Sequence, residues 1–135
     1  MKRLPLTRRY AYLVAAAELG AGVTGLILPD SHFHGISYAP ADRLVTHFLH
    51  LPGDPSTWWS WLIVILAAAA LFAIYHRNDS WTRTCFAALC GWWVFWAILY
   101  AAAWGNPNSG PWGPWLALIA AVGNSRPVIA RPLSD

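Results

Sequence analysis

The segment Tyr10–Leu28, YAYLVAAAELGAGVTGLIL, decides the architecture that the sequence predicts. It is an apolar run with a single carboxylate, Glu18, near its middle. Its nineteen residues at about 1.5 Å of rise each reach about 28 Å, close to the ~30 Å hydrocarbon core of a bilayer. A single segment crosses that core as a helix, because a helix pairs its own backbone groups. We therefore expect a first membrane span over residues 10–28.

Small side chains surround Glu18 on its helical face. Most of its neighbours at helical spacing are Ala or Gly, and Ala17, Ala21 and Gly25 form a small-xxx-small series. Such a face lets another helix approach closely. We therefore expect Glu18, Gly22 and Gly25 to lie in a helix–helix interface. The candidate hydrogen-bond partners are Thr24, Tyr100, the indole N–H groups of Trp93 and Trp96, or a second copy of the chain.

Two roles are open for Glu18. An ionised carboxylate at the centre of a bilayer costs about 3 kcal/mol on insertion scales, and the other predicted spans hold no Lys, Arg or His at that depth. Glu18 is then either a proton or ion site, or a neutral residue whose hydrogen bonds fix the register of the helices. Nothing else in the spans resembles a proton relay, so the second role is our expectation.

Three more apolar segments predict further spans at residues 58–75, 84–104 and about 112–123. The last is short, since 12 residues reach about 18 Å, and we expect Gly123 and Asn124 to end it. Between the first two spans, a segment from Pro40 to about His50 predicts a short amphipathic helix on the membrane surface. The fold class is therefore an all-α, polytopic membrane protein with four transmembrane helices in one domain, residues 1–135.

An aromatic stripe runs along the span at residues 84–104. Trp93, Trp96, Tyr100 and Trp104 follow helical spacing. We expect these rings to pack against the Ala and Gly faces of the first two spans. The alternative is an aromatic groove for a lipid, a quinone or another apolar ligand.

The composition supports a membrane setting and excludes other classes. Hydrophobic residues make up 57% of the chain and charged residues 11%, against about 25% charged in soluble proteins. The net charge of +3 comes from basic ends and not from a basic face with interleaved aromatics, so we expect no nucleic-acid partner. Cys85 and Cys90 lie in one span, where they cannot pair with each other and are expected to be small core residues.

The loop between the first two spans holds four of the five histidines, His32, His34, His47 and His50. Imidazoles three residues apart on a helix can share a metal, so zinc or copper binding is one interpretation. The expectation is a solvated interfacial loop with no cofactor, since no cysteine joins the histidines. The chain also lacks a phosphate loop, a nucleophile elbow and an HExxH pattern, so we expect no enzymatic activity.

The basic residues predict the orientation. With four spans, eight of the nine Lys and Arg residues fall on one side of the membrane, and Arg43 falls on the other. Positive charge favours the cytoplasmic side. We therefore expect a protein of the bacterial inner membrane with both termini in the cytoplasm.

Three stretches carry a resemblance in pattern: AAAELGAG in the first span, YAPADRLV before WWSWLIVILAAA, and GWWVFWAILYAAAW followed by GPWGPWLALIAAVGN. Over residues 10–124 the chain resembles the small four-span membrane proteins of actinobacteriophages, which often lie among structural and lysis genes. The resemblance implies a phage or actinobacterial membrane setting and transfers no site residue.

The expected function is that of a non-enzymatic membrane protein that acts through helix–helix contacts. Its partners would be the lipid bilayer and either further copies of itself or the other subunits of a membrane assembly. One alternative is a holin-like pore former, in which Glu18 would provide the polar face. Another is a small protein that binds or transports an apolar ligand or a metal.

Overall fold

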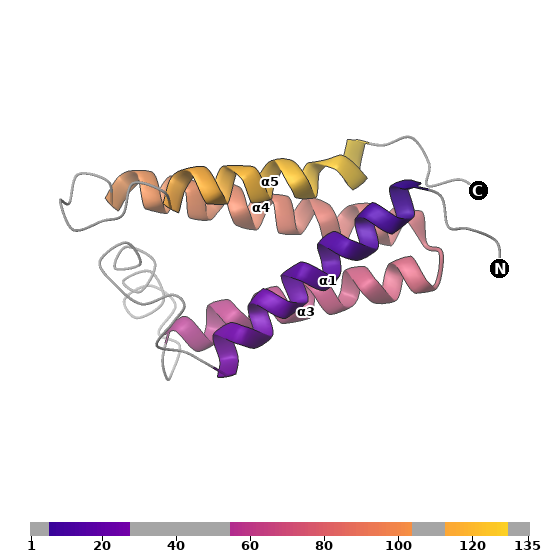
Figure 1. The fold of residues 1–135 in the computed structure, drawn as a ribbon, viewed down its shortest axis with the longest axis horizontal. Helices are drawn as coiled ribbons and strands as arrows, with labels where there is room; N and C mark the ends of the chain where they lie inside the picture. The colour runs from indigo at the N-terminus through magenta and orange to yellow at the C-terminus, as the bar shows by residue number, and fades with distance from the viewer. Residues whose placement is uncertain (1–5, 28–54, 104–112, 130–135) are drawn as a thin grey trace.

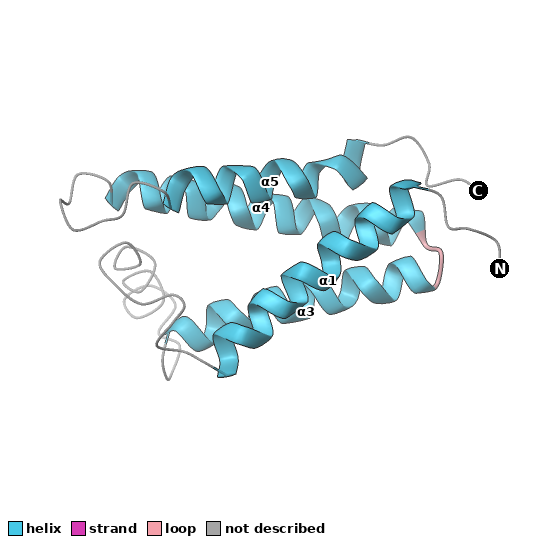
Figure 2. Cartoon of the chain, viewed as in Figure 1, coloured by secondary structure: helices cyan, strands magenta, loops and turns pink. Residues whose placement is uncertain are grey.

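The computed structural model describes residues 6–27, 55–103 and 113–129, and all regular secondary structure within them is helical. Four helices follow in chain order: α1 (Leu6–Ile27), α3 (Pro55–Tyr75), α4 (Asp79–Ala103) and α5 (Gly113–Ile129). A short turn joins α3 to α4 (Figure 2). The predicted surface helix lies outside the described residues.

The helices pack as two pairs, α1 on α3 and α4 on α5, and contacts between α3 and α4 join the pairs. α4 and α5 run side by side, whereas α1 crosses α3 obliquely (Figure 1). α1 and α5 touch over a short stretch. At one end of the molecule α1 begins, α3 turns into α4 and α5 ends (Figure 1). We call this the basic end, because its described residues include Arg8, Arg9, Arg77, Arg83 and Arg126.

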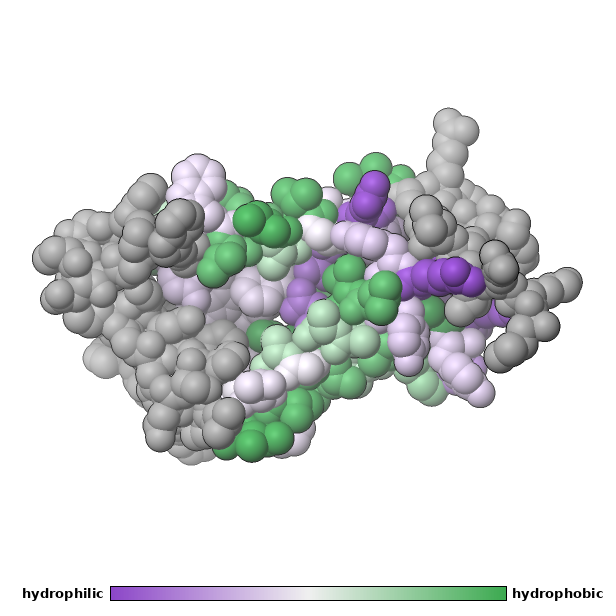
Figure 3. Space-filling model, in the orientation of Figure 1, coloured by the Kyte–Doolittle hydropathy of each residue, from purple (hydrophilic) through white to green (hydrophobic). Residues whose placement is uncertain are grey.

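Three of the helices are long and apolar enough to cross a membrane, over Arg8–Ile27, Thr57–Tyr75 and Asp79–Ala101. The apolar part of α5, Trp115–Ile129, is shorter. Large apolar side chains on all four helices point outward; Leu13, Ile65, Phe72, Ile98 and Ile119 are each at least 60% exposed. On the face drawn in Figure 3, most side chains over the middle of the molecule are apolar, hydrophilic atoms show between them near the centre, and further hydrophilic side chains lie toward the basic end. This distribution suits a surface that meets lipid over its middle.

Two clusters of buried side chains hold the helices together. The first joins α3, α4 and α5 through aromatic rings and consists of Trp59, Ile63, Trp92, Trp96, Ala97 and Ala117. The second joins α1, α3 and α4 through mostly smaller groups and consists of Ala11, Ala15, Ala70, Ile74, Cys85, Phe86 and Leu89. Packing of this kind drives helix association in lipid, where burial of apolar surface gives no advantage over contact with lipid tails.

α1 passes close to α3 where Gly22 faces Val64. A Cβ atom at Gly22 would stand 2.8 Å from Val64 Cγ2 and 3.1 Å from the Val64 backbone nitrogen. α1 therefore passes α3 at this level with no room for a side chain.

α5 extends further than the sequence predicts. Gly123 and Asn124 were expected to end it, but the helix continues through Pro127 to Ile129. Proline lacks an N–H, so Pro127 leaves the carbonyl of Gly123, four residues earlier, without its helical donor. The Tyr10 hydroxyl donates a hydrogen bond to that carbonyl at 3.1 Å. A side chain of α1 thus satisfies the backbone group that the proline exposes.

The α3–α4 turn has the hydrogen bonds of a Schellman motif. Asn78 N–H donates to the Ala73 carbonyl at 3.0 Å and Arg77 N–H to the Ile74 carbonyl at 3.1 Å. Arg77 has a φ of 54°, in the left-handed region that the residue after a helix commonly adopts. The Asn78 side chain then accepts a hydrogen bond from Trp81 N–H at 3.0 Å and caps α4. Asp79 and Ser80 are also residue types common at the N-cap, but both lie within α4.

Candidate functional site

Glu18 lies at the junction of the two helix pairs. Glu18 is buried, with 8% of its surface exposed. The carboxylate oxygen Oε1 accepts two hydrogen bonds, from Trp93 Nε1 on α4 at 2.7 Å and from Asn124 Nδ2 on α5 at 2.7 Å. One carboxylate oxygen therefore connects three helices.

The small face of α1 sets this position. Ala11, Ala15, Gly22 and Gly25 are buried, and the close contact at Gly22 seats α1 on α3. Glu18 lies one helical turn before Gly22 on the same side of α1. Its side chain then reaches from α1 toward α4 and α5, where it is held by hydrogen bonds and not by contact with lipid.

Asn124 is the second polar residue of the site, and it is 1% exposed. Its amide nitrogen donates to Glu18 and also to the Ala120 carbonyl at 2.9 Å, so both N–H hydrogens have an acceptor. Among the residues that the structure describes, the Asn124 Oδ1 atom and the Glu18 Oε2 atom are buried without a hydrogen-bond partner. The site thus presents two oxygen atoms that lack a donor.

The described basic side chains of α1 and α5 near this junction are engaged elsewhere. Arg8, which is 5% exposed, pairs with Asp79 at 3.3 Å. The guanidinium of Arg126 lies 5.3 Å from the centre of the Tyr10 ring, at a distance typical of a cation–π contact. These contacts tie α1 to the start of α4 and the end of α5 at the basic end, and they supply no counter-charge to Glu18.

The residues expected from the sequence occupy different places. Trp93 is half-buried and bonds to Glu18, whereas the Thr24 hydroxyl donates to the carbonyl of Gly20 in its own helix at 2.8 Å. The ring of Tyr100 lies 5.5 Å from that of Trp96. Trp104 and the histidines His32, His34, His47 and His50 lie outside the described residues.

Asn124 was not identified from the sequence as a site residue. An asparagine next to glycine at the end of an apolar run is typical of a helix end, and the structure shows that the helix continues. A signal was present, because a single amide within a membrane helix needs a polar partner and Glu18 is the one carboxylate in a span.

Trp96 lies in the core and not on a groove. It is 0% exposed, and its ring packs edge-on against those of Trp59 and Trp92 at 5.6 Å. These ring contacts are with aromatic side chains of α3 and of α4 itself, whereas the sequence led us to expect Ala and Gly faces, and the burial leaves Trp96 inaccessible to a ligand.

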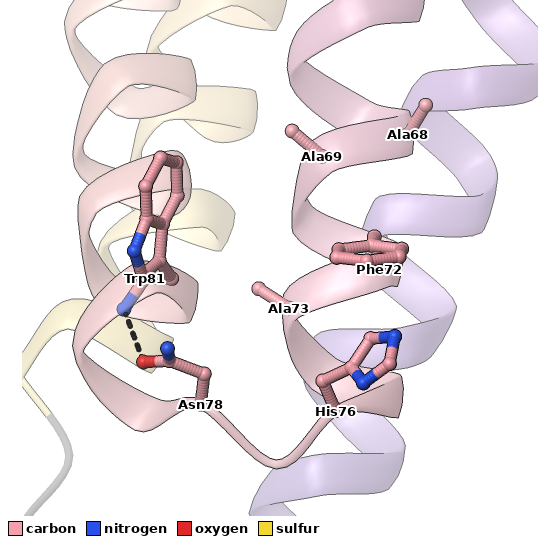
Figure 4. A pocket seen from close by; sticks show the side chains of 7 residues that line it. All are labelled: Ala68, Ala69, Phe72, Ala73, His76, Asn78 and Trp81. Atoms are coloured by element: carbon pink, nitrogen blue, oxygen red, sulfur yellow. Dashed lines mark hydrogen bonds between the residues drawn. The ribbon is translucent and has the colours of Figure 1, made fainter.

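A recess of about 490 Å³ lies instead between α3 and α4 near their turn (Figure 4). Alanines form one wall, with Phe72 and Trp81 on opposite sides and His76 and Asn78 at the turn (Figure 4). The lining is mostly apolar, and its polar groups lie at the basic end. In the described part of the chain no three His, Cys, Asp or Glu side chains group to hold a metal ion.

Comparisons of the chain with protein-family models, with curated proteins and with solved structures give no match.

Proposed function

We propose that this protein is a non-enzymatic, multi-pass membrane protein that acts through helix–helix contacts as a component of a membrane assembly. The proposal rests on the apolar outer faces of the helices, because the polar group of Glu18 is used within the chain. The Glu18 carboxylate accepts hydrogen bonds from two helices of the same chain. One of its oxygens therefore has its partners within a single copy. The outer surface offers large apolar side chains, such as Leu13 and Ile119, for contact with lipid or another helix.

We also propose four spans and cytoplasmic termini in a bacterial inner membrane. The described arginines gather at one end, where α1 begins and α5 ends (Figure 1), which agrees with the preference of positive charge for the cytoplasmic side. α5 supports a fourth span, because its 17 residues reach about 25 Å. A phage or actinobacterial origin stays a prediction from the sequence pattern.

Native mass spectrometry of the protein, extracted from its host in mild detergent, tests the assembly role. We expect a defined complex, either with a stoichiometric partner or with further copies of the chain. A monomer without partners, obtained under conditions that keep known assemblies of the same membrane intact, would contradict the proposal.

A holin-like pore is a weaker proposal. A pore former must expose a polar face when it oligomerises, and Glu18 is buried inside one copy. Such a pore would have to break the hydrogen bonds from Trp93 and Asn124, which connect the helix pairs.

The apolar-ligand alternative is favoured at the recess between α3 and α4. Its apolar walls suit one acyl chain, and His76 at its mouth, followed by Arg77, suits an anionic headgroup at the membrane surface.

Ala68 is exposed and lines the recess, so Ala68→Leu should fill it and reduce the phospholipid retained in native mass spectra. Ala88→Leu on α4 is the matched control, since Ala88 is exposed and does not line the recess. Equal retention by both variants would remove the recess from consideration.

A further inference from the structure

Three features of the Glu18 site point to a positively charged occupant. First, the hydrogen bonds to Glu18 are uneven: both donors, Trp93 Nε1 and Asn124 Nδ2, bond to Oε1. The other oxygen, Oε2, is buried without a donor from any described residue. A buried carboxylate oxygen that lacks a donor or a counter-charge is costly in a membrane.

Second, Asn124 is oriented by its other bonds. Its amide nitrogen is held by Glu18 and by the Ala120 carbonyl, so its oxygen Oδ1 cannot exchange places with the nitrogen without loss of both bonds. Oδ1 is also buried without a donor in the described residues. The site therefore offers one carboxylate oxygen and one amide oxygen, both acceptors, from two side chains already in contact.

Third, the charge of the site suits a single positive charge. Glu18 contributes at most one negative charge, and the carboxylate of Asp79, at the start of α4, is paired with Arg8 at the basic end. Calcium takes six to eight oxygen ligands, usually with several carboxylates, and zinc prefers nitrogen and sulfur ligands. Neither set is present at Glu18 in the described part of the chain.

The two side chains that donate hydrogen bonds to Glu18, those of Trp93 and Asn124, are both neutral. α3 has no titratable side chain between Thr57 and Ile74. α4 contributes Cys85, Cys90 and Tyr100 within its span and Asp79 and Arg83 near its start, and α5 contributes Arg126. On α1, Arg8 pairs with Asp79 and Tyr10 bonds to Gly123, while Arg9 is exposed at the basic end.

We propose that Glu18 and Asn124 form an exchangeable site for one monovalent cation, a proton or Na⁺. A proton would bond to Glu18 Oε2 and be donated to Asn124 Oδ1, whereas Na⁺ would take both oxygens among its ligands. Binding makes the carboxyl site neutral, and release leaves one negative charge on Glu18. This function goes beyond the proposed role in assembly, since a complex forms through outer helix faces whether or not the site exchanges its cation.

Reaction of Glu18 with a hydrophobic carbodiimide tests the site, because the reagent enters apolar regions and reacts with the protonated carboxyl group. The full-length protein in lipid nanodiscs is labelled at a series of pH values, with Na⁺ replaced by choline at constant ionic strength, and modification of Glu18 is quantified by peptide mass spectrometry. Glu18→Gln is the unreactive control.

If Na⁺ is the occupant, Na⁺ at ten times its Kd should slow labelling about tenfold, because about one site in eleven stays free. If the occupant is a proton, Na⁺ has no effect and labelling falls about tenfold for each pH unit once the carboxyl group has ionised. A labelling rate that responds to neither Na⁺ nor pH would overturn the proposal and make Glu18 a permanently neutral structural residue. If Glu18 is not labelled, the infrared carbonyl band of its protonated form replaces labelling as the measurement. The band is identified by its loss in Glu18→Gln, and its dependence on Na⁺ and on pH distinguishes the same outcomes.

Two variants separate a ligand role from a packing role for Asn124. Asn124→Leu and Trp93→Phe each remove one donor to Oε1, but only Asn124→Leu also removes the second ligand oxygen. We expect Asn124→Leu to raise the Kd for Na⁺ at least about tenfold more than Trp93→Phe does. If the occupant is a proton, we expect it to move the midpoint of the pH profile at least about one pH unit further. Equal responses of two folded variants would exclude Asn124 as a ligand.

Discussion

At the scale of single residues, the hydrogen bonds of Glu18 predict an order of stability among its variants. Glu18→Gln keeps an oxygen that accepts from Trp93 and Asn124, so its free energy of unfolding in detergent should stay within about 1 kcal/mol of wild type. Glu18→Leu leaves both donors without an acceptor and should lose about 1–2 kcal/mol for each bond. Thermal unfolding or SDS titration provides the measurement, and equal stability of the Leu variant and wild type would remove Glu18 from the packing argument.

The double variant Glu18→Leu/Asn124→Leu tests whether the residues act as a pair. Replacement of both partners by apolar groups avoids the unpaired polar group that each single change leaves behind, the Asn124 amide after Glu18→Leu and the Glu18 carboxyl after Asn124→Leu. We expect the double variant to be more stable than the sum of the single effects predicts, with a coupling energy of about 1 kcal/mol. Additive losses would show that the two side chains stabilise the fold independently.

At the scale of the helices, the contact of α1 with α3 gives opposite predictions for two glycines. A methyl group at Gly22 collides with Val64, whereas nothing lies within 4 Å of a methyl group at Gly20. Gly22→Ala should lose about 1–3 kcal/mol through overpacking. Gly20→Ala, the matched control on the same helix, should be neutral or gain up to about 1 kcal/mol from helix propensity. The same unfolding measurement checks both variants, and a stable Gly22→Ala would mean that α1 can move off α3.

The start of α4 depends on Asn78, which is exposed and accepts from Trp81 N–H. Asn78→Ala should lose about 1 kcal/mol, while Asn78→Asp should keep the cap and favour the positive end of the helix. Ser80→Ala is the control, because the hydrogen bond from Thr84 goes to the Ser80 backbone carbonyl, which the change preserves. Loss of stability in Ser80→Ala equal to that in Asn78→Ala would contradict the assignment of the cap.

The helices could be predicted from the sequence more fully than their ends. Long apolar runs produce the all-helical architecture and the three lipid-length helices because backbone groups in lipid must be paired within the segment. The end of α5 could not be found in this way. The helix continues past Gly123, whose carbonyl loses its helical donor to Pro127 and accepts from the Tyr10 hydroxyl, 113 residues away in the sequence. Asn124 was missed for the same reason, since its partner is Glu18 on another helix.

At the scale of the whole molecule, the two helix pairs are joined by the α3–α4 contacts and the two buried clusters, and polar side chains of α1 add further links. α1 and α5 touch over a short stretch, and Glu18, Tyr10 and Arg8 link α1 to α4 or α5 through side chains. A pore former would have to part the pairs at these contacts to expose Glu18. We therefore expect the membrane potential of bacteria, reported by a voltage-sensitive dye, to stay intact when the protein is expressed at high level. Collapse of the potential by wild type but not by Glu18→Leu, at equal amounts in the membrane, would instead favour the holin-like pore, because only a carboxylate turned into a shared lumen would produce that difference.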